Sequence, residues 1–357
     1  MIAAGGTGGH MAPALAVAEE LADRGARVSF VTTSSQRALV AGTYPVYELD
    51  MRGFERHVWS MRNVSAIRRL AVAAPRAWRY ISAVRPACVV GGGGYVSGPV
   101  CGLAALRGIP TVAMEADSHL GVTNRLLRPY VRRIFLSFPI EGLDPPKFVV
   151  SGRPLAKRQL DASAAAGRAA FGLVDGLPTV LVFGGSQGAR TLNRACLDAF
   201  ARPDLPIQVI HVCGPRNHHE VAAELAARSA PVERYHLVPY TDRLADAMAA
   251  ADLVVGRSGG SVAEIAALGR PAILVPYPFA SADHQRKNAE WMVRAGAAIM
   301  IDDADLDGVR LSTVVTELLA DDARRAAMAA ASRALGRPDA AALVADGIEL
   351  LMEDRRA

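Results

Sequence analysis

The sequence predicts an α/β protein built from two domains, each with a doubly wound parallel sheet. Apolar runs rich in β-branched residues alternate with helical runs along the chain, which is the pattern of βαβ units with helices on both faces of a sheet. The chain has 357 residues, of which 51% are hydrophobic. This length suits about two domains of roughly 150 residues, and the composition provides each with a sizeable core.

The predicted strands fall into two sets, separated by residues 153–178, which we expect to form a linker and an entry helix. The first set comprises residues 2–4, 28–32, 46–49, 87–90, 111–115, 134–137 and 148–150. The second comprises residues 179–183, 208–213, 235–239, 253–255, 272–276 and 298–301. Two similar halves imply a cleft between them, and open α/β sheets bind ligands beyond the carboxyl ends of their strands.

Charge and cysteine content narrow the function classes. Lys and Arg exceed Asp and Glu by 40 to 35, a mild excess that predicts no nucleic-acid partner but suits a phosphorylated substrate or an anionic membrane surface. The four cysteines form no C-x-x-C pair, which indicates reduced thiols in a cytosolic protein. No apolar run reaches the roughly 18 residues of a membrane span, and no signal peptide is apparent. Because the first strand is so short, we expect the natural start to lie upstream of Met1.

Glycine-rich turns follow four of the predicted strands, at residues 5–9, 91–94, 184–188 and 256–260. Such turns bring backbone amides and a helix N-terminus close to an anion. The first matches neither the dinucleotide fingerprint nor a P-loop, and we expect a helix after it with Pro13 in its first turn. It ends in His10, which is either a structural hydrogen-bonding residue or a group that titrates near neutral pH. Four such turns indicate two anionic ligands or one long one.

Residues 253–268 read as a strand, a glycine loop and a helix beginning at Ser261. Glu264, one turn into that helix, could hold the vicinal hydroxyls of a ribose. It could equally complete a capping box with Ser261 as the N-cap residue. The sequence alone leaves both interpretations open.

Two further segments bear on function. Residues 52–86 carry arginines alternating with apolar residues, and they include Trp59 and Trp78. The pattern predicts either a basic amphipathic helix in an anionic membrane interface or a solvated face over a buried stripe. Residues 302–308 resemble the start of a calcium loop, but Val314 occupies the position of its bidentate Glu. No G-x-S-x-G occurs, so we expect chemistry without a metal or a covalent intermediate.

Five spaced motifs together resemble the MurG family, the UDP-N-acetylglucosamine:N-acetylmuramyl-(pentapeptide) pyrophosphoryl-undecaprenol N-acetylglucosamine transferases, which convert lipid I to lipid II in peptidoglycan synthesis. The motifs are residues 5–10, residues 93–99, residues 184–193, Arg257-Ser258-Gly259 with Glu264-Ile265-Ala266, and His284-Gln285 with Asn288-Ala289. The resemblance implies a GT-B fold, with an acceptor and membrane-association domain over residues 1–155 and a UDP-sugar domain over residues 156–337. It also implies that a final helix, residues 338–357, packs back on the first domain.

The resemblance implies roles for particular residues. Glu264 would hold the uridine ribose, and other donor contacts would come from Gly185, Ser186, Arg257, Ser258, Gly260, Ser261, His284, Gln285 and Asp117. The acceptor diphosphate would bind at Thr7, Gly8, Gly9, Gly93, Gly94 and Tyr95. Contact with the anionic membrane would come from Trp59, Arg68, Arg69 and Trp78, which places the protein peripherally on the cytoplasmic face of a bacterial plasma membrane. No cofactor is implied beyond the donor UDP-GlcNAc, and cell-wall synthesis proteins are implied as further partners.

The implied reaction is an in-line displacement by the acceptor 4-hydroxyl with inversion. His10 is the first candidate for the general base and Glu115 the second. The chain departs from the family pattern in two places. It has Met114-Glu115-Ala116-Asp117 where the family has His-Glu-Gln-Asn, and Gly152-Arg153-Pro154-Leu155-Ala156 where the family has Gly-Asn-Pro-Val-Arg.

Three alternatives remain open at this point. A related GT-B transferase with a different UDP-sugar or a soluble acceptor would share the second half but would not need the basic Trp-bearing segment. A membrane-docked sugar-nucleotide sensor would lack turnover. An NAD-dependent oxidoreductase would need a fingerprint that the sequence does not contain.

Overall fold

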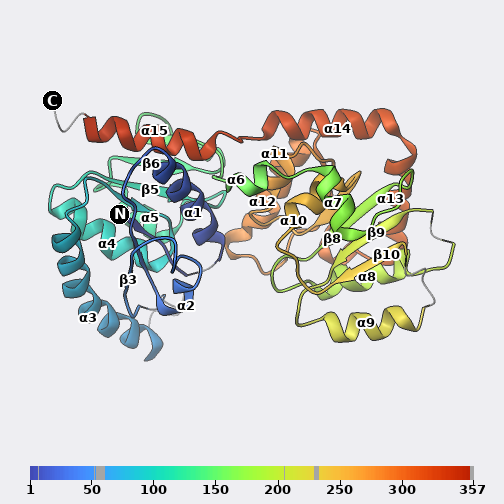
Figure 1. Cartoon of the computed structure of the whole chain (residues 1–357), viewed down its shortest axis with the longest axis horizontal. Helices are drawn as coiled ribbons and strands as arrows, with labels where there is room; N and C mark the ends of the chain where they lie inside the picture. Colours follow the sequence, from blue (N-terminus) through green and yellow to red (C-terminus); the bar gives the residue numbers. More distant parts are fainter. Residues whose placement is uncertain (7, 52, 54–60, 205, 229–232, 354–357) are drawn as a thin grey trace. The chain divides into compact units, whose positions relative to one another are not determined.

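The computed structural model describes the chain except residues 7, 52, 54–60, 205, 229–232 and 354–357 (Figure 1). The candidate residues Thr7 and Trp59 therefore lie outside the described part. The chain divides into two compact units, the first comprising Met1–Lys157 with Arg337–Ala357 and the second Arg158–Gly336. Each contains one parallel sheet with helices around it, which confirms the predicted fold class.

Unit 1 holds a seven-stranded sheet in the order β3-β2-β1-β4-β5-β6-β7. Its strands are β1 (Ile2–Ala3), β2 (Phe30–Thr32), β3 (Val46–Glu48), β4 (Val89–Gly91), β5 (Thr111–Glu115), β6 (Arg133–Leu136) and β7 (Phe148–Val150). Its helices are α1 (Gly8–Asp23), α2 (Ser34–Arg37), α3 (Met61–Val84), α4 (Gly94–Leu106), α5 (Val122–Leu127) and α15 (Ala340–Glu353), and α6 (Lys157–Leu160) begins at the boundary.

Unit 2 holds a six-stranded sheet in the order β10-β9-β8-β11-β12-β13. Its strands are β8 (Thr179–Phe183), β9 (Gln208–Val212), β10 (Tyr235–Val238), β11 (Leu253–Gly256), β12 (Ala272–Leu274) and β13 (Ala298–Met300). Its α-helices are α7 (Ala164–Phe171), α8 (Arg190–Phe200), α9 (His218–Ala226), α10 (Leu244–Ala250), α11 (Val262–Ala267), α12 (His284–Arg294), α13 (Gly308–Ala320) and α14 (Asp322–Leu335).

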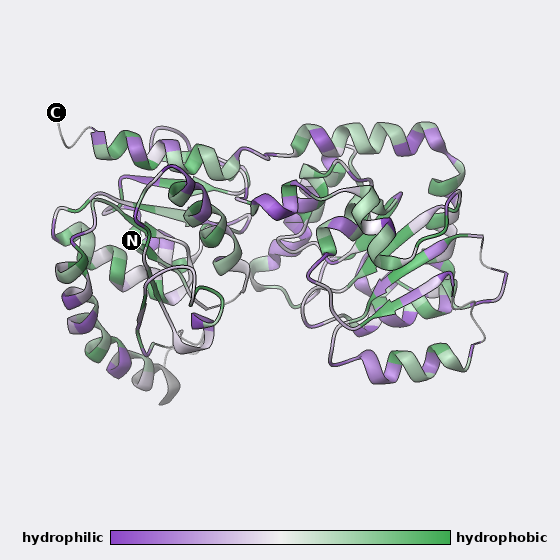
Figure 2. Cartoon of the chain, in the orientation of Figure 1, coloured by the Kyte–Doolittle hydropathy of each residue, from purple (hydrophilic) through white to green (hydrophobic). Residues whose placement is uncertain are grey.

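The central strands are buried on both faces, as expected where helices cover both sides of a parallel sheet, whereas the edge strands β3, β7, β10 and β13 are partly exposed. In β1 the alternation of side chains sends Ile2 into one hydrophobic cluster and Ala3 into another on the opposite face. The strands accordingly show as hydrophobic segments in both units (Figure 2). No helix in the described part of the chain combines the length and the apolar character needed to cross a membrane.

The beginning of α1 differs from the sequence prediction. The helix starts at Gly8, so Gly9 and His10 lie in its first turn and not in a loop before it. Pro13 lies beyond the first turn, in the helix interior. Pro13 has no amide hydrogen, so it cannot bond to the carbonyl of Gly9 four residues earlier. That carbonyl is available to another donor.

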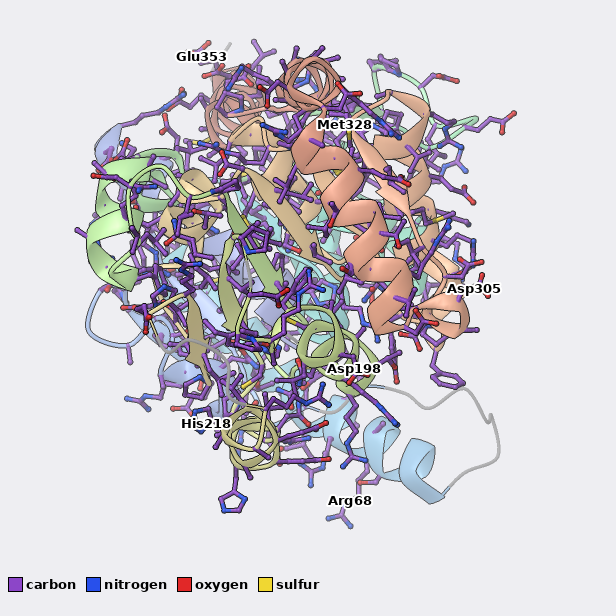
Figure 3. All side chains as sticks on the ribbon, turned by 90° about the vertical axis from the view of Figure 1, so that its right-hand side faces the viewer. Arg68, Asp198, His218, Asp305, Met328 and Glu353 are labelled. Atoms are coloured by element: carbon purple, nitrogen blue, oxygen red, sulfur yellow. The ribbon has the colours of Figure 1, made fainter. Side chains whose placement is uncertain are left out.

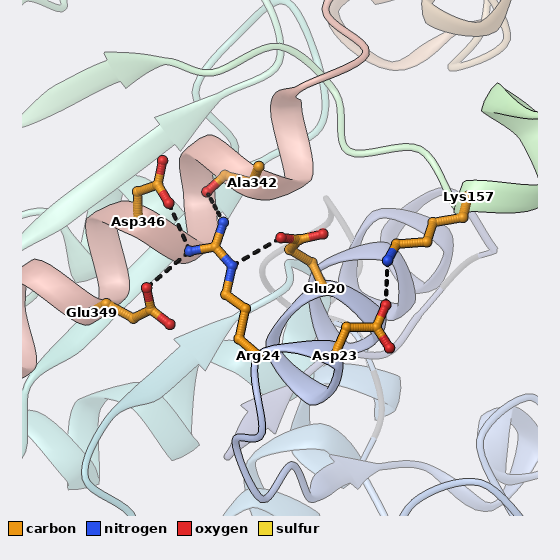
Figure 4. Close-up of polar contacts among 7 residues, drawn as sticks. All are labelled: Glu20, Asp23, Arg24, Lys157, Ala342, Asp346 and Glu349. Atoms are coloured by element: carbon orange, nitrogen blue, oxygen red, sulfur yellow. Dashed lines mark hydrogen bonds and ion pairs between the residues drawn. The ribbon is translucent and has the colours of Figure 1, made fainter.

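The C-terminal helix α15 packs on α1 within unit 1. Val344, Ala345 and Ile348 are buried in the same cluster as residues of β1 and α1. At the edge of this contact the Arg24 guanidinium donates to Asp346 at 2.6 Å and to Glu349 at 2.8 Å (Figure 4). The apolar residues supply most of the docking energy, because ion pairs that face solvent contribute little.

Replacing one residue from each part of this contact separates their contributions. We expect Ile348→Ala to lower the free energy of unfolding by about 2–4 kcal/mol, because it leaves a cavity in a packed core. We expect Arg24→Ala to lower it by about 1 kcal/mol or less. Urea denaturation followed by circular dichroism measures both changes. A larger effect from Arg24→Ala would mean that the ion pairs hold α15.

Candidate active site

The four glycine-rich turns lie at equivalent places in the two units. In unit 1 the strand order reverses between the neighbouring strands β1 and β4, and residues 5–9 and 91–94 follow these strands. In unit 2 it reverses between β8 and β11, and residues 184–188 and 257–260 follow them. Ligands of open α/β sheets bind at the carboxyl ends of strands where the order reverses. Each unit therefore presents a ligand site formed by two of the four predicted turns.

In unit 1 the two glycine turns contact each other. A Cβ at Gly94 would overlap the carbonyl oxygen of Gly5, and a Cβ at Gly93 would meet the ring of His10. Both glycines have positive φ angles, of 76° and 100°, which side-chain-bearing residues rarely adopt. The structure thus brings His10 against the second turn, although 83 residues separate His10 from Gly93 in the sequence.

His10 is largely buried in this arrangement. Burial lowers the pKa of its imidazole below the usual value of 6.5, the charge of Asp117 raises it, and the charge of Arg153 lowers it. The neutral form of the ring therefore prevails at pH 7. A neutral imidazole has a nitrogen lone pair that can accept a proton.

Glu115, the second candidate base, ends β5 and is 5% exposed. Its Oε2 accepts hydrogen bonds from the Gly121 amide at 2.8 Å and from Asn124 Nδ2 at 2.9 Å, and its Oε1 accepts one from the Asp117 amide at 3.2 Å. Burial raises the pKa of this carboxyl, and these three bonds lower it. The carboxylate thus holds the turn from Ala116 to Gly121.

The remaining acceptor candidates lie around the same turns. Gly8 and Gly9 are exposed in the first turn of α1, and Gly94 and Tyr95 open α4. The Tyr95 ring lies close to both Gly6 and Gly53, where added Cβ atoms would come within 3.5 and 3.2 Å of it. The Tyr95 ring therefore lies beside the first glycine turn and limits the space next to it.

In unit 2 the turn after β8 exposes Gly185 and Ser186. The turn packs closely against Cys213, the residue that follows β9. Gly188 has a φ of 73°, and a Cβ there would overlap the Cys213 carbonyl oxygen. That oxygen also accepts hydrogen bonds from Asn193 Nδ2 at 2.9 Å and Asn217 Nδ2 at 3.2 Å. These two asparagines were not predicted as site residues. They support a turn in which Gly185, Ser186 and Gln187 are exposed.

The turn after β11 is tied to the start of α12. The Ser258 hydroxyl is fully buried and donates to the Gln285 carbonyl at 2.7 Å, and Asn288 Nδ2 donates to the Ser258 carbonyl at 3.0 Å. Gln285 Oε1 accepts from the Tyr277 amide at 3.0 Å, while its Nε2 lies beside Gly259. The Ser258 hydroxyl thus ties this turn to α12. His284, the first residue of α12, lies next to Gln285.

Arg257 was a donor-binding candidate, but its guanidinium is used inside the fold. It is 8% exposed, forms an ion pair of 2.6 Å with Asp303, and donates to the carbonyls of Val275 and Pro276 at 3.2 and 3.1 Å. The Asp303 carboxylate also accepts from the Thr191 hydroxyl at 3.2 Å. Arg257 thus joins the ends of β11, β12 and β13 beside the turn after β11.

The capping-box interpretation of residues 261–264 is only partly realised. Ser261 is the N-cap residue of α11, but its hydroxyl makes no capping hydrogen bond and lies 3.5 Å from the Arg257 carbonyl. Glu264 follows in the first turn of α11 and is partly exposed, as are Gly260 and Ser261. The Ser261 half of the predicted capping box is therefore absent.

The predicted calcium-like segment serves the fold. Asp302 pairs with Arg286 at 2.7 Å, Asp303 pairs with Arg257, and Asp307 caps α13 by accepting from the Arg310 amide at 2.7 Å. Among the residues that the structure describes, no group of three or more His, Cys, Asp or Glu side chains could hold a metal ion.

Residues 61–84 of the basic Trp-bearing segment form α3, which has a solvated face over a buried stripe. Ala66, Ala73, Ala77 and Ile81 form a buried stripe. The opposite face exposes residues at helical spacing, namely Arg68, Val72, Arg76 and Arg79, and Arg68 extends away from the ribbon in Figure 3. Trp78 is 45% exposed at the flank, under the guanidinium of Arg107, which lies 4.5 Å from the ring centre. Arg69 pairs with Asp50.

Comparisons with known proteins agree with this architecture. The family models for the glycosyltransferase family 28 N-terminal and C-terminal domains match residues 1–136 and 179–344. A relative from Halothermothrix orenii, named UDP-N-acetylglucosamine--N-acetylmuramyl-(pentapeptide) pyrophosphoryl-undecaprenol N-acetylglucosamine transferase, is 36% identical, and the match covers 94% of each chain. A relative of the same name from Limosilactobacillus fermentum is 38% identical, with 95% of each chain covered. The crystal structure of Acinetobacter baumannii MurG superposes with a TM-score of 0.77 at 29% identity, over 98% of each chain. The chain therefore belongs to the MurG family within glycosyltransferase family 28.

Proposed function

We propose that the chain transfers N-acetylglucosamine from UDP-GlcNAc to the 4-hydroxyl of undecaprenyl-diphosphate-linked N-acetylmuramyl pentapeptide, which converts lipid I to lipid II in peptidoglycan synthesis. The observation that carries this proposal is the imidazole of His10 lying against the second glycine turn at the carboxyl edge of the unit 1 sheet. A proton acceptor next to two anion-binding turns suits an acceptor that carries both a hydroxyl and a diphosphate. Family membership supports the same reaction.

On this proposal unit 2 binds the donor. Backbone amides of residues 184–188 and 258–262 hold the UDP diphosphate, and the exposed hydroxyl of Ser186 adds a donor. Glu264 binds the ribose hydroxyls, and Gln285 Nε2 with His284 binds sugar hydroxyls. Negative charge develops on the leaving UDP as the glycosidic bond breaks. Preorganised amides stabilise that charge without reorganising during the reaction.

Unit 1 binds the acceptor on the same proposal. The glycine turns at residues 5–9 and 91–94 receive the lipid diphosphate, and the nearby imidazole removes the proton from the 4-hydroxyl. His10 suits this task better than Glu115, because the Glu115 carboxylate already accepts three hydrogen bonds within the turn that it holds. Glu115 then acts as a positioning residue. Its hydrogen bond from the Asp117 amide keeps Asp117 close to the site. The family resemblance implies that Asp117 contacts the donor sugar.

A lipid-linked acceptor requires the enzyme to reach a membrane surface. The exposed face of α3 carries Arg68, Arg76 and Arg79 around Val72, which is 54% exposed. Such a surface attracts anionic headgroups and inserts a small apolar area. We propose that this face holds the protein peripherally on the cytoplasmic side of a bacterial plasma membrane.

A transfer assay with His10→Ala tests the reaction and its base together. The protein should release UDP from UDP-GlcNAc only when a polyprenyl-diphosphate-linked N-acetylmuramyl peptide is present. His10→Ala should lower the rate by about 10² or more and leave UDP affinity unchanged. Because burial lowers the pKa of His10, the acid limb of the kcat/KM profile should lie below pH 6.5. A nearly normal rate for His10→Ala would transfer the role of base to another group.

Two glycine substitutions on α4 test the acceptor turns. We expect Gly94→Ala to lower acceptor turnover by at least tenfold, because its Cβ would overlap the Gly5 carbonyl at a positive φ. UDP affinity should stay unchanged, since unit 2 binds the donor. Gly102→Ala is the matched control, because a Cβ there meets no atom within 4 Å. Equal activity of the two variants would contradict the assignment of the acceptor to these turns.

Vesicle binding tests the proposed membrane face. We expect Arg68→Gln with Arg79→Gln to weaken binding to vesicles containing phosphatidylglycerol roughly 30-fold, at about 1 kcal/mol per cation. Arg310→Gln with Arg324→Gln changes the net charge equally on exposed helical positions of unit 2. Sedimentation with vesicles measures both double variants. If both lose affinity equally, net charge and not the face of α3 governs binding.

A further inference from the structure

Arg153 joins the two segments that form the unit 1 site. It follows β7 and is 8% exposed. Its Nη2 donates to the Gly9 carbonyl at 2.6 Å, and its Nη1 donates to the Ala116 carbonyl at 3.2 Å. One rigid guanidinium therefore connects the first turn of α1, which carries His10, to the turn after β5, which carries Glu115 and Asp117.

The Gly9 bond has a specific origin. Within a helix this carbonyl would accept from the amide four residues later, but that residue is Pro13, which has no amide hydrogen. Gly9 is exposed, but its bond to Arg153 is partly buried. Arg153 supplies the missing donor at the turn that bears His10. The proline and the arginine thus act together on the position of the imidazole.

Two opposite charges on different segments act on the imidazole. The charge of Asp117, in the turn after β5, raises its pKa, and the charge of Arg153, in the segment after β7, lowers it. The second glycine turn contributes Gly93 and Gly94, which carry no charge. Positions 117 and 153 are both Asn in the family pattern quoted above, so this chain carries an acid and a base where that pattern has two neutral amides.

We propose that Arg153 is a positioning residue for His10, and that Asp117 and Arg153 form a balanced charge pair that sets the pH at which His10 acts as the base. This inference rests on the proposed role of His10 in the transfer reaction. Arg153 fixes the first turn of α1 through the Gly9 carbonyl, which holds the imidazole against Gly93. The charge of Arg153 favours the neutral imidazole, and the charge of Asp117 opposes it.

The pH profile of transfer in four variants tests the pair. Arg153→Asn should move the acid limb of kcat/KM upward by about 0.5–1 pH unit, because the neutral imidazole loses the charge that favours it. Asp117→Asn should move it downward by a similar amount. The double variant should return it close to the original position. Arg153→Lys should keep the limb in place but lower kcat roughly tenfold, because an ammonium cannot hold both carbonyls in the geometry of the guanidinium.

An independent titration separates this inference from the proposed function. The His10 imidazole signal, assigned by its loss in His10→Ala, is followed by NMR over pH in the full chain without substrates. If His10 is required for transfer but its pKa is the same in Arg153→Asn and Asp117→Asn, the charge pair is disproved. If the pKa moves as expected while His10→Ala still transfers sugar, the pair stands and the role of His10 as base fails.

Circular dichroism and UDP affinity check that each variant remains folded. Should Arg153→Asn fail to fold, two variants still test the inference: Arg153→Lys should lower kcat with the limb in place, and Asp117→Asn should move the limb downward. A purely structural arginine would lower kcat in every variant of residue 153 without moving the limb. That result would also overturn the inference.

Discussion

The close approach of backbone segments at the two strand-order reversals is the constraint on which the rest of the structure depends. Gly94 lies where any side chain would overlap the Gly5 carbonyl, and Gly188 lies where one would overlap the Cys213 carbonyl. Glycine is needed at each place because it combines a positive φ with the absence of a Cβ. In unit 2 the turn held by Gly188 exposes Gly185 and Ser186. Thus the feature that packs each unit also forms its anion-binding surface.

Close backbone packing creates buried polar groups, and the chain satisfies them with side chains from distant segments. Arg153 bonds to the carbonyl that Pro13 leaves without a partner, and Glu115 accepts the amides of the turn that follows β5. In unit 2, Asn193 and Asn217 bond to the carbonyl beside Gly188. A buried unpaired group would cost about as much as a core cavity. These residues therefore hold the turns rigid, and a catalytic turn must be rigid to position reacting groups.

The sequence was sufficient for the fold and for the four glycine turns of the candidate site, but not for the contacts of each side chain. Alternating apolar runs predicted the strands because burial on both faces leaves a local signature in composition, and glycine runs marked the four turns. The start of α1 was misplaced, because whether Gly8 and Gly9 enter a helix depends on tertiary contacts. Arg257 and Ser258 could not be distinguished from ligand contacts, since their partners lie 46 and 27 residues away. Long-range pairing of this kind leaves no local pattern.

Charged and neutral groups have different roles in unit 2, and this difference has a physical consequence for the reaction. In unit 2 the buried cation at the centre, Arg257, is neutralised by Asp303, so a diphosphate there would be held chiefly by backbone amides and by neutral side chains such as Ser186 and Gln285. Amides fixed by the fold lose no side-chain entropy on binding, whereas a long cationic side chain does. On the proposed function, amide dipoles that the fold holds near the leaving group would stabilise the charge that grows there as the bond breaks. A site of this design favours the transition state over the bound substrate, which is the requirement for raising kcat.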